Sequence, residues 1–581
     1  MPVRLTGAER YVVKEVCAGR TADLSRWRGG KNRHIRGFVI RDLVLGRLPL
    51  PPQGAPRPQR CATVGVYIHN AEIDGPIDLR DAAPEETDYL PALELIDCDI
   101  PEMIDVTHAR LQRLSLRDSR IVKLDGRRLR LAGNINLEGV SSWETARYAR
   151  DKNGKQPAPT GAFGEGCCWV RLSGARIGGN VLARAATLCV RALKWHYDLK
   201  LNKAYLDKKL LFKIDIKNLI VLKKCFIHNP ALTKSPYALN LSDADIGGSV
   251  QAEPFFQAIG GVTIANARIG GAVWMQGATL RAYAHCALNG QTAGIDGALV
   301  MRTYSSVPRP REYERGTTES ISYKDSRVTQ LKFKCASRAE QRAEQTPEAK
   351  SEFIAEYLRF TATGDIWLLG ARIGSDLDMS GGSVSQPENI TPAHAATQYS
   401  AQPKFVITGA RIGRNFMIWG VRIGEISPHS KPYLQWSEIA DGIAAQDAVI
   451  GGNLFGRNAY LGWAGNETGK KNTKSRHGIM APGLSVKGEL DLWNSHTGRI
   501  DLDGAKVGSD LKLGGGSTVY DPKFSRRLSK AACLRNAIAI NCADIEIGED
   551  LTFEDRNTKG QINLRRARIN GTLRFDHKIR G

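Results

Sequence analysis

The chain has 581 residues, and its 82 lysine and arginine side chains outnumber 60 aspartate and glutamate side chains, giving a formal net charge of +22. Hydrophobic residues make up 42% of it. The sequence has no run of about 18 apolar residues that could cross a bilayer, and its start lacks the apolar core of a signal peptide. Composition therefore excludes a transmembrane protein and predicts a basic, soluble, cytoplasmic one.

Residues 1–60 predict a basic α-helical N-terminal cap. Thr6 and Glu9 match the N-cap and the reciprocal glutamate of a capping box, so a helix should begin there. A second helix is expected over residues 35–45, before a proline cluster that ends it. The residues predicted to face inward are Val12, Val13, Val16, Phe38, Val39 and Leu43. A separate partner-binding domain is the alternative interpretation of this segment.

From residue 61 onward, one spacing of apolar residues recurs, with successive gaps of two, three, two, four and two positions. Full or near-full copies of this template start at residues 66, 93, 170, 188, 214, 239, 262, 288, 366, 405, 443, 479, 500, 540 and 562, and defective copies near 114 and 124. One full copy is Ile366, Leu368, Ala371, Ile373, Leu377 and Met379.

The template predicts an all-β fold. A gap of two is the signature of a short strand, because alternate residues point to the same side. The longer gaps are turns, and the four-residue gap usually carries glycines such as Gly178 and Gly179, where we expect positive φ. Residues 61–581 should therefore form a right-handed parallel β-helix, a solenoid with three short strands per coil of about 22 residues, whose stacked coils share one core.

The interval between the last strand of one copy and the next copy varies widely, whereas the turns inside a copy hardly vary. Insertions are expected at about residues 138–165, 302–365, 380–404, 419–442, 457–478 and 514–537. They should leave the coil at one corner and line up along one edge of the rod, where solenoid proteins commonly bind partners.

Basic residues recur at the outward position of the second strand of the template. This row is Arg176, Lys194, Arg268, Arg372, Arg411, Lys506 and Arg568, and the acidic residues expected to interrupt it are Glu72, Asp99, Asp245 and Glu546. Two basic loops add Lys470, Lys471, Lys474 and Arg476, and Arg526 and Arg527. Such a row could bind phosphates of a nucleic acid or of an anionic membrane surface. Alternatively, it keeps the rod soluble and prevents lateral association.

No residue stands out as catalytic, cofactor-binding or metal-ligating, because no spacing typical of a metal site, a nucleophile or a phosphate loop is present. Cys98, Cys225 and Cys542 fall on inward template positions, which predicts small core residues. No cofactor and no small-molecule substrate are expected, and whether the protein is an enzyme stays open.

Several segments together resemble a known family. They are Leu5-Thr6-Gly7-Ala8-Glu9, Ala22-Asp23-Leu24, Ile35-Arg36-Gly37-Phe38 and the coils reading Gly-Ala-Arg-Ile-Gly-x-x-Leu-x-Leu. Over nearly the whole chain, this resembles a bacterial pentapeptide-repeat-like β-solenoid family, some of whose members are labelled membrane-associated oxidoreductase. The resemblance implies the solenoid fold, and that label implies redox activity. The chain departs from the Ala-Asp/Asn-Leu-x-x motif of acidic DNA mimics and has the opposite charge.

Three functions follow as hypotheses. The first is a non-enzymatic binding or scaffold protein, a rigid basic rod presenting its insertions along one edge to a protein or anionic partner. The second is a nucleic-acid-binding protein that uses the arginine row and the basic cap. The third is an oxidoreductase or carbohydrate-active enzyme on a β-helix scaffold.

Overall fold

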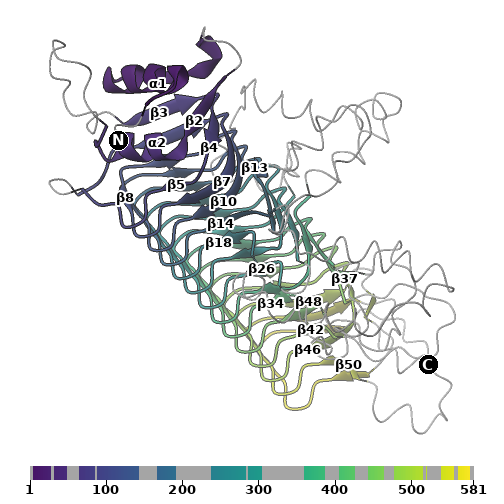
Figure 1. The fold of residues 1–581 in the computed structure, drawn as a ribbon. Helices are drawn as coiled ribbons and strands as arrows, with labels where there is room; N and C mark the ends of the chain where they lie inside the picture. The colour runs from purple at the N-terminus through teal and green to yellow at the C-terminus, as the bar shows by residue number, and fades with distance from the viewer. Residues whose placement is uncertain are drawn as a thin grey trace, which may run out of the picture.

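The computed structural model describes residues 4–27, 32–48, 65–84, 88–142, 167–190, 237–282, 286–303, 359–385, 405–425, 442–462, 477–514, 518–519, 538–554 and 561–575. These residues form a long rod of stacked coils with two α-helices at its N-terminal end (Figure 1). The fold is an all-β parallel solenoid, as the template predicted.

Each central coil contributes one strand to each of four sheets, which form the four sides of the rod. In one coil, β18 (Leu239–Asn240) lies on side 1, β19 (Asp245–Ile246) on side 2, β20 (Val250–Gln251) on side 3 and β21 (Gln257–Ile259) on side 4. The next coil repeats this order, and corresponding strands pair in parallel.

Side 1 consists of β5 (Ile77–Asp78), β7 (Asp99–Asp105), β10 (Arg120–Asp125), β14 (Cys167–Arg171), β18, β22 (Val262–Thr263), β26 (Leu288–Asn289), β30 (Ile366–Trp367), β34 (Phe405–Val406), β38 (Ile443–Ala444), β42 (His477–Met480), β46 (Arg499–Asp501), β50 (Ile538–Asn541) and β53 (Gln561–Asn563). Side 2 consists of β8 (Arg110–Leu111), β11 (Arg130–Leu131), β15 (Arg176–Ile177), β19, β23 (Arg268–Ile269), β27 (Gly294–Ile295), β31 (Arg372–Ile373), β35 (Arg411–Ile412), β39 (Val449–Ile450), β43 (Ser485–Val486), β47 (Lys506–Val507), β51 (Glu546–Ile547) and β54 (Arg568–Ile569).

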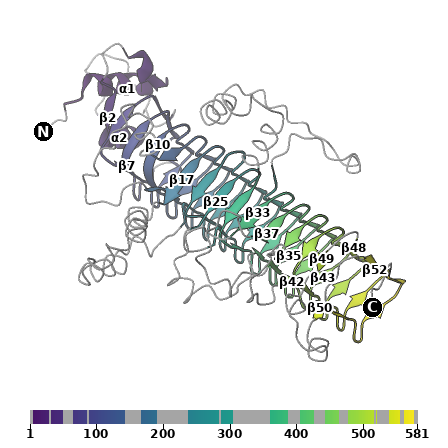
Figure 2. The ribbon, with the colours of Figure 1, turned by 90° about the vertical axis from the view of Figure 1, so that its right-hand side faces the viewer.

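Side 3 consists of β1 (Ala22–Asp23), β3 (Val66–His69), β6 (Leu93–Ile96), β9 (Leu114–Ser115), β12 (Ile135–Asn136), β16 (Val181–Leu182), β20, β24 (Val273–Trp274), β28 (Leu299–Val300), β32 (Leu377–Asp378), β36 (Phe416–Met417), β40 (Leu454–Phe455), β44 (Leu490–Asp491), β48 (Leu511–Gly514), β52 (Leu551–Glu554) and β55 (Leu573–Phe575). Side 4 consists of β2 (His34–Arg36), β4 (Glu72–Asp74), β13 (Ser141–Ser142), β17 (Thr187–Val190), β21, β25 (Thr279–Arg281), β29 (Thr361–Thr363), β33 (Ser383–Ser385), β37 (Arg422–Glu425), β41 (Tyr460–Leu461), β45 (His496–Thr497) and β49 (Thr518–Val519). The long strands β7 and β10 also begin on this side, since Asp99 pairs with β4 and Arg120 with β13, and they continue onto side 1. Figure 2 shows β17, β25 and β33 of side 4 stacked along the rod.

The three predicted strands of a coil are present, and side 4 is a fourth strand that the sequence did not predict. Several side-4 strands, such as β29, β33 and β41, lie inside the segments expected to be insertions. The inward side chains of side 4 are mostly apolar, as at Leu280, Val384 and Leu461. Each strand usually supplies only one of them, however, and the interval to the next side-1 strand differs from coil to coil, so no fixed spacing marks this side in the sequence.

The template also changes sides along the rod. Copies starting at residue 239 and beyond run over sides 1, 2 and 3. The copies at 66 and 93 begin on side 3 instead and continue over sides 4 and 1, since β3 pairs with β6 and β4 pairs with β7. The switch falls between residues 109 and 137, where the defective copies were found. The copy expected at 188 begins on side 4, and the one at 214 lies outside the described residues.

The strand bounds from β18 onward show two turns of fixed length in each coil, four residues from side 1 to side 2 and three from side 2 to side 3. The connection from a side-3 strand to the next side-1 strand varies: it has 10 residues between Gln251 and Val262 and 65 between Val300 and Ile366.

The inward template positions form the core. In the copy starting at Ile366, all six apolar side chains are at most 2% exposed. Cys98 and Cys542 are buried among them, as predicted, whereas Cys225 lies outside the described residues. In the last coil, Leu573 and Phe575 are 43% and 50% exposed, and no further described coil covers them.

The paired glycines of the four-residue gap do not have positive φ, contrary to the prediction. Positive φ occurs instead at the turn before the second strand, as at Gly370 and Gly409, both +65°. The gap glycines are required by close packing between coils: a Cβ on Gly374 would lie 2.1 Å from the carbonyl oxygen of Asp296, and one on Gly413 would lie 2.1 Å from that of Gly374.

The N-terminal helices are α1 (Gly7–Cys17) and α2 (Gly37–Val44), with a short 3-10 helix at Leu24–Arg26. The predicted capping box is present, because the Thr6 hydroxyl accepts the N–H of Glu9 and the Glu9 carboxylate accepts the N–H of Thr6. Val39 and Leu43 are buried as expected. Phe38 is only partly buried, under the guanidinium of Arg36, and Ile40 takes the inward position. Cys17 is disulfide-bonded.

Candidate functional site

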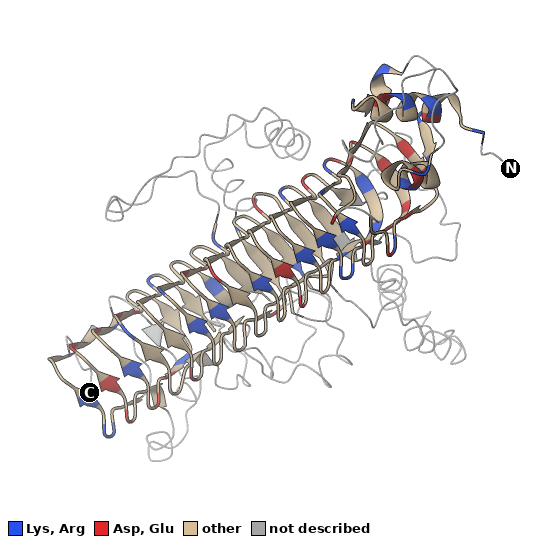
Figure 3. Cartoon of the chain, turned by 90° about the vertical axis from the view of Figure 1, so that its left-hand side faces the viewer, with Lys and Arg blue, Asp and Glu red and all other residues tan. Residues whose placement is uncertain are grey.

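The outer face of side 2 carries one row of aligned side chains. In each strand, the first residue points outward and the second, usually isoleucine, points into the core, because successive residues of a strand alternate. The outward residues pair in register from coil to coil. In order they are Arg110, Arg130, Arg176, Asp245, Arg268, Gly294, Arg372, Arg411, Val449, Ser485, Lys506, Glu546 and Arg568. Figure 3 shows the row as mostly blue strands interrupted by red ones.

The predicted residues Arg176, Arg268, Arg372 and Arg411 all lie in this row and are exposed. Neighbouring strands are spaced by about 4.8 Å, so directly adjacent arginines such as Arg372 and Arg411 bring like charges close together. Within the described chain, none of these four arginines forms an ion pair.

At the C-terminal end of the same row, a glutamate neutralises the neighbouring basic side chains. There the Glu546 carboxylate lies 3.1 Å from Lys506 Nζ and 3.5 Å from Arg568 Nη1, in the coils on either side. The positive charge of the row is therefore concentrated in its N-terminal and central parts.

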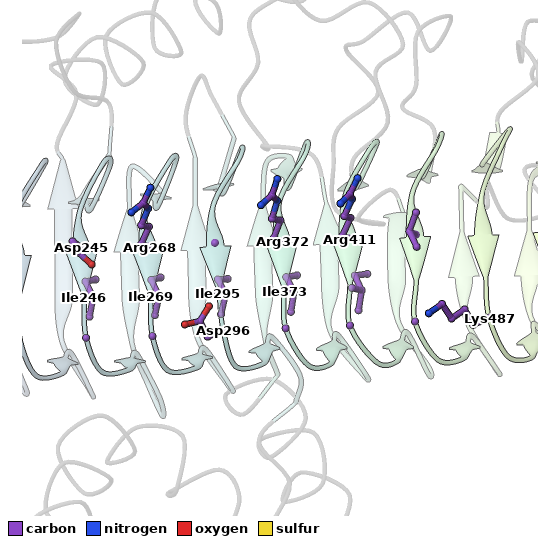
Figure 4. A pocket seen from close by; sticks show the side chains of 18 residues that line it. Asp245, Ile246, Arg268, Ile269, Ile295, Asp296, Arg372, Ile373, Arg411 and Lys487 are labelled. Carbon is purple, nitrogen blue, oxygen red and sulfur yellow. The ribbon is translucent and has the colours of Figure 1, made fainter.

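A shallow groove of about 770 Å³ follows the central part of the row. Its surface is formed by the arginines, the backbone beside the inward isoleucines, and the aligned gap glycines Gly247, Gly270, Gly374, Gly413 and Gly451. Figure 4 shows Arg268, Arg372 and Arg411 projecting in the same direction, with the strand of Ile295 between the first two. The groove exists because glycine leaves no side chain beside the row, and Asp296 and Lys487 are the charged exceptions.

The sequence assigned some residues to the row wrongly, missed two others and named several that lie outside the described residues. Glu72 and Asp99 do not interrupt it, since they pair with each other in β4 and β7, away from side 2. The physical reason is that the template has shifted by one side in those coils, which the sequence does not reveal. Arg110 and Arg130 were missed, although Ala-Arg-Leu at residues 109–111 differs from the recurring Ala-Arg-Ile only in its last residue. Outside the described residues lie Lys194, Lys470, Lys471, Lys474, Arg476, Arg526 and Arg527.

The described residues contain no group of three or more histidine, cysteine, aspartate or glutamate side chains that could hold a metal ion. Burial raises the pKa of the Cys98 and Cys542 thiols to about 12, so both stay protonated near neutral pH. In the part of the chain that the structure covers, no helix is long and apolar enough to span a membrane.

No family model, curated protein or solved structure matches this chain. The resemblance to pentapeptide-repeat-like solenoid proteins therefore stays a prediction, as does the expectation that insertions along one edge bind a protein partner.

Proposed function

We propose that this chain is a non-enzymatic binding protein that holds an extended polyanionic partner along the outer face of side 2. The observation that carries the proposal is the in-register row of exposed arginines beside a glycine-lined groove. The arginines stand at multiples of one strand spacing, about 4.8 Å, which suits a ligand that is itself a repeating chain of anions. Closely placed guanidinium groups without carboxylate partners favour such a ligand, since binding relieves their mutual repulsion.

The chemistry of the groove supports recognition of charge rather than of bases. Its described lining contains arginine, isoleucine, glycine, aspartate, valine and lysine, with no aromatic side chain on which a base could stack. Contacts from arginine to backbone phosphates position a nucleic acid but carry no sequence information. A nucleic acid bound here would therefore be held without sequence preference and released by salt.

The proposal is tested with a labelled single-stranded oligonucleotide as the polyanion, followed by fluorescence anisotropy between about 50 and 200 mM salt. The variant replaces Arg268, Arg372 and Arg411 by serine, the residue that stands at position 485 of the same row. We expect weaker binding at every salt concentration. The slope of log K against log salt, which is negative, should become shallower by about 2, because each lost phosphate contact to a single strand contributes roughly 0.7.

A control variant removes an equal number of arginine charges from sides 3 and 4 of the rod. It carries Arg281→Thr, Arg422→Ser and Arg574→Thr, each replacing an exposed arginine by the residue aligned with it in the neighbouring coil. Binding should then weaken only slightly. Equal losses in both variants would show that net charge, rather than the row, governs binding, and would contradict the proposal.

A further inference from the structure

A second cleft, of about 470 Å³, opens over the first three strands of side 2, apart from the central groove. Arg110, Arg130 and Arg176 reach it from β8, β11 and β15 in direct register. The preceding turns add further basic groups. The complete lining is His108, Arg110, Arg128, Arg130, Gly174 and Arg176, with no carboxylate among them.

The arginines of this cleft have no acidic partner, unlike arginines on other sides of the same coils. There, Arg120 is paired with Asp99, and Arg127 Nε with Asp125 Oδ1 at 3.0 Å. Within the described chain, Arg110, Arg128, Arg130 and Arg176 form no ion pair. Four guanidinium groups therefore share one cleft without internal neutralisation, which is unfavourable unless an anion occupies it.

Arg128 occupies a position where arginine is conformationally unfavourable. Its φ is +54°, in the turn position that glycine fills at Gly370 and Gly409. Bulky side chains rarely adopt such a φ. Arg566, with φ +59° in the last coil, is held by a 2.7 Å ion pair with Asp544, whereas the Arg128 side chain runs beside Gly174, where a Cβ would lie 3.4 Å from Arg128 Cγ.

Carboxylates limit the cleft at both ends. At one end, Asp81 Oδ1 lies 2.9 Å from His108 Nδ1. At the other, the coil after Arg176 places Asp245 in the row and Asp243 in the turn. The positive region spans three strands, or about 10 Å between the outer two. This length suits a compact anion rather than a long polymer.

We propose that this cleft is a binding site for a compact ligand carrying two or more phosphate groups. Guanidinium forks bind phosphate oxygens in bidentate fashion, and three in-register arginines with a fourth from the turn can engage more than one phosphate at once. The ligand could be a free oligophosphate or the phosphorylated headgroup of a lipid, which present the same chemistry. The inference does not depend on the proposed function, because no residue of the central groove lines this cleft.

The test measures the binding of inorganic tripolyphosphate to the full-length protein by isothermal titration calorimetry. Arg128→Gly removes one guanidinium and also places the residue that this φ favours, so the variant should fold at least as stably as the parent. Arg130→Ser introduces the residue found at position 485 of the same row. We expect tripolyphosphate to bind one-to-one and at least about tenfold more tightly than monophosphate. Each substitution should weaken it by about tenfold or more.

Matched controls are Arg566→Gly, at the equivalent turn of the last coil, and Arg281→Thr, on side 4. Both should leave tripolyphosphate affinity within about twofold of the parent. Three results would overturn the proposal: unchanged affinity in Arg128→Gly and Arg130→Ser, an equal loss in the controls, or monophosphate binding as tightly as tripolyphosphate. The melting temperature of each variant shows whether it is folded.

Vesicles distinguish the two sources of the ligand. Binding to phosphatidylcholine vesicles containing phosphatidylinositol bisphosphate, displaced by tripolyphosphate and lost in Arg128→Gly, identifies a lipid headgroup. Tripolyphosphate binding without vesicle binding identifies a soluble oligophosphate. Either result supports the cleft, whereas vesicle binding that persists in Arg128→Gly and is not displaced would contradict it.

Discussion

At the scale of single residues, one buried carboxylate joins the N-terminal helix to the rod. The Glu9 side chain is fully buried and accepts the backbone N–H of Thr6 at 2.8 Å and the guanidinium of Arg36 at 2.7 Å. Burial acts to raise the pKa of Glu9. The hydrogen bonds from Arg36 and from the backbone N–H groups of Thr6 and Arg36 outweigh it and hold that pKa below its ordinary value of 4.5.

Because the pKa of Glu9 is depressed in the folded state, its ionised form stabilises the protein above pH 4.5, and that stability is lost as the pH falls through the depressed pKa. Replacing Glu9 by glutamine should lower the free energy of unfolding of the N-terminal helices by about 1–3 kcal/mol at neutral pH. The difference from the parent should shrink towards zero at acidic pH. Amide hydrogen exchange of α1 as a function of pH measures it.

Glu15→Gln serves as the control, since it removes the same charge from α1. Glu15 pairs at the surface with an exposed arginine, Arg20, at 2.6 Å, so the change should cost much less stability than Glu9→Gln. A loss of protection in Glu9→Gln that does not diminish as the pH is lowered below 4.5 would contradict the assigned role of the ionised carboxylate.

At the scale of elements, a ladder of side chains at the turn between sides 2 and 3 ties several coils to the next. Asn415 Oδ1 accepts the backbone N–H of Asn453 at 3.0 Å, and Asn453 Oδ1 accepts that of Glu489 at 2.8 Å. Asp376 and Asp510 accept in the same way from the coils that follow them. The ladder satisfies backbone donors at a turn where the strands have ended.

Replacing Asn453 by alanine removes the acceptor of the Glu489 N–H, so we expect the free energy of unfolding to fall by about 1–2 kcal/mol. Aspartate at the same position keeps the acceptor oxygen and should cost about 0.5 kcal/mol or less. Denaturant unfolding of both variants checks this. If alanine and aspartate are equally destabilising, the acceptor is not what the ladder contributes.

At the scale of the whole molecule, the coils should behave as exchangeable units, because each one pairs only with its two neighbours. Ile443, Ile479 and Ile500 occupy the same register in three successive coils. Deleting residues 479–499 therefore removes one complete coil and allows β46 to pair with β38.

We expect this deletion variant to fold into a rod shorter by about 4.8 Å, with unchanged secondary structure per residue. Small-angle X-ray scattering measures the length of the rod, and circular dichroism measures the secondary structure. A deletion of residues 479–489, about half a coil, is the control. It would stack strands of one side on strands of another side, so it should prevent folding. Unfolding of the complete-coil variant would contradict the exchangeability of coils.

The periodicity of the sequence was enough to predict a parallel solenoid and the inward residues of three sides. It could not predict side 4, because each of its strands usually supplies one inward apolar residue, such as Leu280 or Val384, and the interval to the next side-1 strand differs from coil to coil. For the candidate site, the outward arginines of side 2 were predicted from alternation alone. The basic cleft was not, since Arg128 lies in a turn and Arg110 and Arg130 belong to imperfect copies of the template.

The sequence by itself determined which side chains point inward and which outward, because that choice depends only on alternation along a strand. The tertiary structure alone decided which residues of different coils become neighbours, because that depends on the hydrogen-bond register between coils. Residues at the same template position therefore lie on different sides: Glu72 and Asp99 lie away from side 2, whereas Arg372 and Arg411 lie in its row. The stacking of coils also brings Arg128, from a turn, into the cleft with Arg130 and Arg176.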